Sequence, residues 1–220
     1  MVITIIEQQD LLLQISKKLP RQITAYAIGG TAMIFYGLKE TTLDIDLVFT
    51  NQKDRETFKE TVKSMGYNDM DPIIVYGRKP NTPDMIKLYN SRIDLFLNQV
   101  INFTFSEDMQ KRAKETHQFG KNLILKTADI HDLIIMKCAT NREKDEKDII
   151  SIMKNSKVNW EILVNEAQNQ INLGNEQAIL SLGTLLEKLK NLDIQVPTKV
   201  LDQLWELLKN QIEKKKSKSK

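Results

Sequence analysis

The sequence predicts an α+β protein, in which a mixed sheet with flanking helices is followed by a C-terminal helical bundle. Over about the first 125 residues, short apolar or alternating segments, typical of strands, are interspersed with helical patterns. From Asp129 onward glycine and proline become sparse, and the apolar positions follow helical spacing. A change of pattern of this kind indicates an α/β part followed by an all-helical part.

The first elements follow from apolar spacing and from the residues that end helices. Residues 3–19 carry a helical pattern that ends at the following proline. Residues 23–28 form a short apolar segment and precede Gly29-Gly30, after which a helix is predicted over 31–37. The alternation of polar and apolar residues at 43–49 predicts a strand.

The middle of the chain adds one helix and further strands. Residues 52–66 predict a helix that ends at its glycine. Residues 85–89 and 92–97 predict a hairpin around Asn90-Ser91, a turn-forming pair. Two more short apolar segments are also predicted to be strands, namely 73–76 and 123–125.

The second part of the chain is predicted to be helical throughout. Its helices share apolar positions at helical spacing and cover 129–140, 146–155, 160–173, 176–190 and 199–212. We expect three regions: an α/β domain with its adjoining helices over 1–155, a helical region over 156–213 and a disordered basic tail over 214–220.

Composition excludes several classes of protein. The chain has 220 residues and a net charge of +3, yet its last eight residues hold five lysines and one glutamate, so the body is close to neutral. There is no apolar run of about eighteen residues and no signal-peptide pattern, so we expect a cytoplasmic protein without a membrane span. One cysteine and two histidines argue against a zinc site and favour oxygen ligands, hence Mg²⁺ or Mn²⁺.

The most informative residues lie between Gly29 and Asp46. Asp44 and Asp46 are two apart on a predicted strand and therefore project to the same face, where a divalent cation would relieve their repulsion. Gly29, Gly30 and Thr31 lie between a strand and a helix, where exposed amides and a hydroxyl can bind phosphate. Each feature alone has an ordinary alternative: a simple turn for the glycines and a solvated strand face for the acids.

A third acid, Asp94, lies in an otherwise apolar strand and needs a reason to be there. If its strand lies beside that of Asp44 and Asp46, three carboxylates converge. Three converging acids next to a phosphate-binding turn are typical of two-metal phosphoryl transfer.

This order of residues resembles the DNA polymerase beta-type nucleotidyltransferase superfamily, over roughly residues 20–150. The resemblance implies that Gly30 and Thr31 hold the triphosphate of an NTP such as ATP, with Gly29 in the same turn. It also implies that Asp44 and Asp46 bind two Mg²⁺ ions, and that Asp94 helps to bind metal or to activate the acceptor. The arginine that often precedes the paired acids in toxin-like members is missing, and Lys39 is the nearest cation.

The segment 132–149 is similar to the helical segment of the AbiEii-like and MenT-like, toxin-like branch of that superfamily. The resemblance implies that Lys137 and Lys144 assist nucleotide binding by neutralising the triphosphate. It implies supporting roles for Arg142, Asp145 and Asp148, and the two acids could orient these cations. The alternative is that a helix rich in lysine and acids is only a solvated face.

The predicted function is therefore NTP-dependent transfer of a nucleoside monophosphate to an acceptor. By resemblance, the acceptor is tRNA or protein in a toxin–antitoxin or defence setting, with a cognate antitoxin as partner. Three alternatives stay open: an aminoglycoside-like small acceptor, a non-catalytic nucleotide-binding module, and a helical interaction protein whose α/β half is only a scaffold. The oligomeric state does not follow from the sequence.

Overall fold

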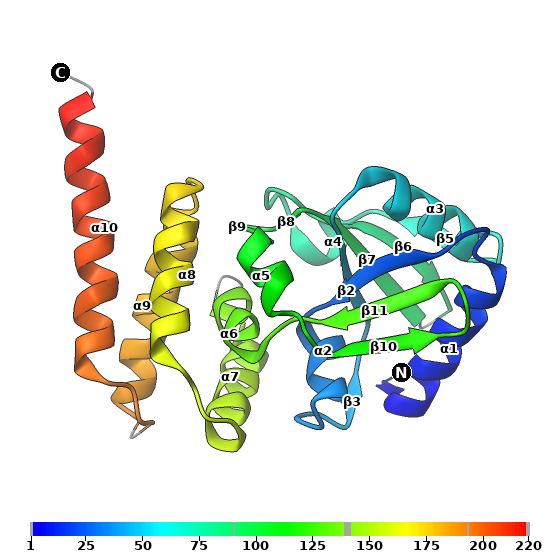
Figure 1. The fold of residues 1–220 in the computed structure, drawn as a ribbon, viewed down its shortest axis with the longest axis horizontal. Coiled ribbons are helices and arrows are strands. Elements are labelled where there is room, and N and C mark those ends of the chain that lie inside the picture. Colours follow the sequence, from blue (N-terminus) through cyan, green and yellow to red (C-terminus); the bar gives the residue numbers. More distant parts are fainter. Residues whose placement is uncertain (1, 90, 139–141, 193, 219–220) are drawn as a thin grey trace. The chain divides into compact units, whose positions relative to one another are not determined.

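The computed structural model describes residues 2–89, 91–138, 142–192 and 194–218. The chain divides into two compact units, drawn in Figure 1. The first consists of Met1–Ile101 and Phe105–Asp129, and the second of Asn102–Thr104 and Ile130–Lys220. The predicted functional boundary at residue 155 stays a prediction.

The first unit is built on a mixed sheet with the strand order β10-β11-β2-β4-β7-β6-β5. Only two of its neighbouring pairs are parallel, β11 with β2 and β4 with β7, and the other pairs are antiparallel. The strands are β2 (Ile23–Ala27), β4 (Ile45–Phe49), β5 (Asn68–Met70), β6 (Asp84–Leu88), β7 (Ser91–Leu97), β10 (Thr116–Phe119) and β11 (Leu123–Thr127). This arrangement confirms the predicted α+β class.

Shorter pieces complete the first unit. The helices are α1 (Ile5–Lys18), α2 (Gly29–Phe35), α3 (Gln52–Lys63), α4 (Ile73–Tyr76) and α5 (Glu107–Arg112). Strand β8 (Gln99–Val100) pairs antiparallel with the end of β7, and β1 (Ile3–Thr4) pairs with β3 (Thr41–Thr42) in a separate small sheet. Strands of two or three residues carry too little alternation to be recognised in the sequence.

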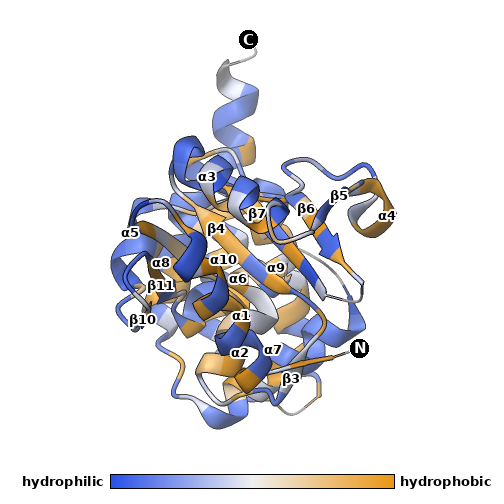
Figure 2. Ribbon diagram, turned by 90° about the vertical axis from the view of Figure 1, so that its right-hand side faces the viewer, coloured by the Kyte–Doolittle hydropathy of each residue, from blue (hydrophilic) through white to orange (hydrophobic). Residues whose placement is uncertain are grey.

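The core of the first unit lies on the central strands. Leu47 on β4 and Leu95 on β7 are fully buried, and so is Phe58, which α3 packs against Phe49. Figure 2 shows the hydrophobic residues concentrated along β4 and β7. A sheet that is covered on its faces needs apolar residues at most positions. A charged residue on these strands is therefore an exception that needs an explanation.

Residues 73–76 form helix α4, so the prediction of a strand there was wrong. The Asp71 side chain accepts a hydrogen bond from the Ile73 N–H at 2.9 Å, and Pro72 holds a helical backbone conformation at the N-cap. These two residues start a helical turn before the β-branched run begins. The side chains of Ile73 and Ile74 are exposed, so the run fills no place in the core.

The second unit is helical, as predicted. It contains the short strand β9 (Phe103–Thr104) and the helices α6 (Ile130–Cys138), α7 (Glu143–Asn155), α8 (Trp160–Asn172), α9 (Glu176–Lys190) and α10 (Thr198–Lys218). A side chain at Gly183 in α9 would meet the Trp205 ring of α10 at 3.0 Å, so this glycine permits close helix packing. No helix among the described residues has the length and apolar content needed to cross a bilayer.

The basic C-terminal segment differs from its prediction as a disordered tail over 214–220. Helix α10 continues to Lys218, and residues 219–220 lie outside the described residues. Lysine is a good helix former, and the Lys215 Nζ lies 2.7 Å from a carboxylate oxygen of Glu176. Once α10 is packed against the bundle, the helix therefore extends into the lysine-rich segment.

Candidate functional site

Three carboxylates converge on one face of the central sheet. Asp46 on β4 and Asp94 on β7 are Cα partners on neighbouring parallel strands, and Asp44 directly precedes β4. Asp46 and Asp94 therefore project to the same face, and the carboxylate of Asp44, in the bend before β4, joins them there. One carboxylate oxygen from each residue can be chosen so that all three lie within 4.8 Å of one another. The sequence-based expectation that Asp94 joins the paired acids is met.

The acids are removed from water to different degrees. Asp94 is fully buried, Asp44 is buried, and Asp46 is half-buried. Carboxylates at such close range repel one another, and burial increases the cost of their charge. The cluster is therefore stable in its ionised form only where cations or hydrogen-bond donors compensate the charge.

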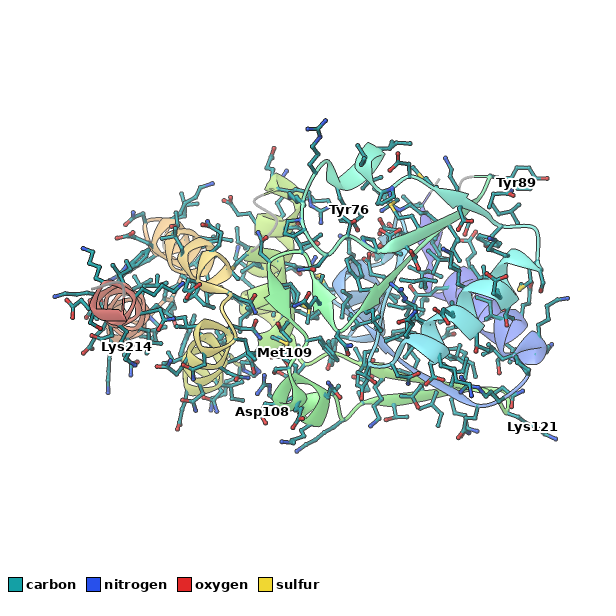
Figure 3. All side chains as sticks on the ribbon, turned by 90° about the horizontal axis from the view of Figure 1, so that it is seen from above. Tyr76, Tyr89, Asp108, Met109, Lys121 and Lys214 are labelled. Carbon is teal, nitrogen blue, oxygen red and sulfur yellow. The ribbon has the colours of Figure 1, made fainter. Side chains whose placement is uncertain are left out.

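Two residues that the sequence analysis did not identify supply such donors. The Arg92 guanidinium contacts the Asp44 carboxylate, and its Nε donates to the Asp94 Oδ1 at 2.9 Å. The hydroxyl of Tyr76, labelled in Figure 3, donates to the Asp94 Oδ2 at 2.7 Å. Arg92 could have been found, because Arg-x-Asp repeats the two-residue spacing of the paired acids. Tyr76 could not, because its segment was assigned to a strand.

The paired glycines bring the backbone close to the acids. Gly29 has φ +56°, and a Cβ built on it would lie 2.4 Å from the Asp46 Oδ2. A Cβ on Gly30 would lie 2.3 Å from the Thr42 hydroxyl oxygen. Residues other than glycine would therefore collide with the side chains around the site. Both positions therefore require glycine for steric reasons. The expected turn before the helix is corrected, because Gly29 and Gly30 are the first two residues of α2.

Thr31 acts on the backbone that carries the acids. Its side chain is fully buried, and its hydroxyl accepts a hydrogen bond from the Asp46 N–H at 2.8 Å. The hydroxyl in turn donates to the Asp44 carbonyl oxygen at 3.5 Å. Thr31 therefore ties α2 to the segment that bears Asp44 and Asp46. The predicted contact between its hydroxyl and a phosphate stays a prediction.

The second set of predicted site residues belongs to the helical unit. The Lys137 Nζ lies 2.6 Å from the Asp148 Oδ2 and 3.3 Å from the Asp145 Oδ1. Arg142 donates from its Nε to the other oxygen of Asp145 at 2.6 Å. Lys144 lies on the same helix, α7, and is exposed. The structure thus joins Lys137, Arg142, Asp145 and Asp148 in one ion-pair network, while their predicted role in nucleotide binding stays a prediction.

Asp44, Asp46 and Asp94, together called the Asp triad, fit a hard divalent cation, the kind that prefers oxygen ligands. All of its donors are carboxylate oxygens, which Mg²⁺ and Mn²⁺ prefer. The Gly29 backbone packs directly against the Asp46 carboxylate, so this glycine helps to fix the position of that acid. Cys138, by contrast, is buried in α6, and burial raises the pKa of its thiol, so it is not a reactive nucleophile.

Comparison with known proteins supplies a family. The model of a family described as "Nucleotidyltransferase of unknown function (DUF6036)" matches residues 3–191. Among solved structures, the crystal structure of ANT(2")-Ia in complex with adenylyl-2"-tobramycin is similar, with a TM-score of 0.44 and 13% sequence identity. The similarity covers 82% of this chain and 98% of that chain. No curated protein sequence matches the chain.

Proposed function

We propose that this chain, which belongs to the nucleotidyltransferase family of unknown function DUF6036, moves a nucleoside monophosphate from an NTP to an acceptor in a Mg²⁺-dependent reaction. The observation that carries the proposal is the convergence of Asp44, Asp46 and Asp94 beside the turn at Gly29. The family supports a nucleotide substrate, and three clustered carboxylates support a divalent cation. Mn²⁺ would serve as well.

In the proposed reaction, an acceptor oxygen forms a bond to the α-phosphorus of the NTP. The bond between that phosphorus and the bridging oxygen of the leaving pyrophosphate breaks, and the acceptor proton passes to a base. When two Mg²⁺ ions are bound by Asp44, Asp46 and Asp94, they would neutralise the triphosphate and acidify the acceptor hydroxyl. The protein positions these ligands rigidly, through the β4–β7 pairing and through Thr31.

The glycine turn has a second proposed task. Gly29 and Gly30 begin α2, and we propose that backbone N–H groups at this helix start bind the β- and γ-phosphates. We also propose that Lys137 and Lys144 assist by neutralising phosphate charge. Their support is the resemblance of their segment to the toxin-like branch, together with the supporting residues Arg142, Asp145 and Asp148.

The proposed acceptor is tRNA or another macromolecule, in a toxin–antitoxin or defence setting with a cognate antitoxin. This finer proposal rests on the same resemblance. It is tested by incubating the protein with α-³²P-labelled NTPs and with total RNA or total protein. A labelled band that depends on Mg²⁺ identifies the acceptor class, whereas release of label into small molecules only would favour a small acceptor.

Asp46→Asn tests the catalytic site. We expect this variant to lose transfer by roughly 100-fold or more, because changes even outside the ligand shell of a metal cost about 10–100-fold. Binding of Mn²⁺, measured by calorimetry, should weaken in parallel. Asp69→Asn is the matched control, because Asp69 is an exposed acid of the same unit that pairs with Lys63. Unchanged Mn²⁺–NTP binding in Asp46→Asn would remove the basis of the proposal. If the unmodified protein binds Mn²⁺–NTP but transfers no nucleotide, a non-catalytic nucleotide-binding module is favoured.

A further inference from the structure

We propose that Arg92 is the internal counter-cation of the Asp triad. It holds Asp44 and Asp94 in place, and it competes with the divalent cation for their oxygens. Metal affinity is then set by this arginine as well as by the acids. The proposal rests on the proposed function and deepens it, because it names a residue that controls metal binding at the same site.

The register of β4 and β7 brings Arg92 next to the acids. The Cα partners of β4 and β7 include Ile45 with Ile93 and Asp46 with Asp94, so the residues just before them are also in line. Arg92 therefore lies beside Asp44, as Asp94 lies beside Asp46. Asp46, Asp94 and Arg92 on the paired strands and Asp44 just before β4 thus form one group of neighbouring charged residues.

Arg92 contacts two acids of the triad, and all three side chains are largely buried. The Arg92 guanidinium bridges Asp44 and Asp94, the two most buried acids of the triad, whose side chains are 9% and 0% exposed. Its own side chain is 18% exposed. The planar guanidinium has donors in fixed directions, so one arginine can orient two carboxylates at once. Removing it would leave buried acids without their nearest cation.

A second cation, Lys87, lies on the other side of Arg92 from the acids. Lys87 on β6 is the Cα partner of Arg92, so the two cations share one face of the sheet, and Lys87 is exposed. Like charges opposite each other on neighbouring strands repel. The guanidinium is therefore favoured on the side of Asp44 and Asp94, where opposite charges attract it.

The consequence concerns any divalent cation that uses these carboxylates. At Asp94 the ion has to share a hydrogen-bonded oxygen, because Arg92 and Tyr76 donate to its two oxygens, and it meets the positive charge of Arg92 at short range. Arg92 therefore weakens the binding of the metal alone. The phosphates of an NTP offer the displaced guanidinium new oxygens, so metal and nucleotide should bind more tightly together than separately.

The experiment measures Mn²⁺ binding to the full chain by electron paramagnetic resonance, without nucleotide, at fixed pH and ionic strength. We expect Arg92→Gln to bind Mn²⁺ roughly tenfold more tightly than the unmodified protein, because a nearby positive charge is removed. Arg21→Gln is the matched control, because it removes the same charge from the same unit, where Arg21 pairs with Asp54. It should leave Mn²⁺ affinity unchanged.

A second variant keeps the test decisive if Arg92→Gln does not fold. Arg92→Lys retains the charge but cannot bridge two carboxylates with a planar fork, so we expect Mn²⁺ binding about threefold tighter than in the unmodified protein. Equal or weaker Mn²⁺ binding in a folded Arg92 variant would overturn the proposal. If Asp46→Asn left Mn²⁺ binding unchanged as well, the proposed function would fail, whereas loss of binding in Asp46→Asn would confine the failure to Arg92.

Discussion

Gly29 and Gly37 differ in what their surroundings demand of them. Both have positive φ values, +56° and +66°, which glycine adopts at little cost. A Cβ on Gly29 would collide with the Asp46 carboxylate, whereas a Cβ on Gly37 would meet nothing within 4 Å. The first glycine therefore serves the site, and the second serves only the backbone. This distinction is not visible in the sequence.

Substitution by alanine separates the two roles. We expect Gly29→Ala and Gly37→Ala each to lose roughly 1–2 kcal/mol of unfolding free energy, because a residue with a Cβ is strained at positive φ. Only Gly29→Ala should also displace Asp46 and weaken Mn²⁺ binding, by roughly 10–100-fold. Denaturant unfolding and calorimetric Mn²⁺ titration of both variants check this. Normal Mn²⁺ affinity in Gly29→Ala would contradict the close approach of the turn to the acid.

At the level of elements, α6 and α7 are joined by charge as well as by apolar packing. Lys137 lies in the apolar sequence of α6 and is almost completely buried. Asp145 and Asp148 on α7 bind its ammonium group, and both of these acids are buried too. Burial of a lysine in so apolar a helix is costly unless its charge is paired, and the two acids of α7 provide that pairing. A role in nucleotide binding would be additional.

We expect Lys137→Met to lower the unfolding free energy by roughly 3–5 kcal/mol, because two buried acids would lose the ammonium group that bridges them, although Asp145 would keep Arg142 as a partner. Lys147→Met, on α7, is the matched control. Lys147 pairs with Glu143 at 2.9 Å, but both side chains are exposed, so its loss should leave stability within the error of the measurement. Denaturant unfolding followed by circular dichroism compares the two. Equal stability of the two variants would show that the buried network contributes nothing.

At the scale of the whole molecule, the net charge of +3 describes the C-terminal segment rather than the body. The lysines at 214–216 continue α10 as an exposed, basic end, and Lys215 keeps the pKa of Glu176 below its usual range. The acids of the triad lie in the other compact unit. A nucleotide-binding enzyme can be close to neutral where metal ions neutralise the substrate locally.

Removal of residues 214–220 should therefore spare Mg²⁺–NTP binding. Any attraction to RNA that the lysines supply should be sensitive to salt and should decrease in the truncated chain. Calorimetry with Mg²⁺–NTP and RNA binding at two salt concentrations test the two parts. Replacement of Lys214, Lys215 and Lys216 by glutamine in the full chain controls for shortening of the helix. Loss of Mg²⁺–NTP binding on truncation would place the nucleotide site in a different part of the chain.

The general fold was predictable because it follows from local patterns. The helices of the second part follow from the helical spacing of apolar residues. The antiparallel pair of strands within 85–97 follows from two short apolar segments separated by turn-forming residues. The helix at 73–76 was not predictable from its β-branched residues, because Asp71 and Pro72 start a helical turn that overrides their preference for strands. The same error concealed Tyr76 as a partner of Asp94.

The sequence by itself determined that Asp44 and Asp46 share a face, because their spacing matches the pleat of a strand. It also determined that paired glycines between a strand and a helix precede them, although in the structure these glycines begin the helix itself. Only the tertiary structure decided that Asp94 completes the cluster and that Arg92 bridges two of its acids, because these contacts depend on the parallel register of β4 and β7. That register is set by the packing of the whole sheet, and residues far apart in the chain meet only when it forms.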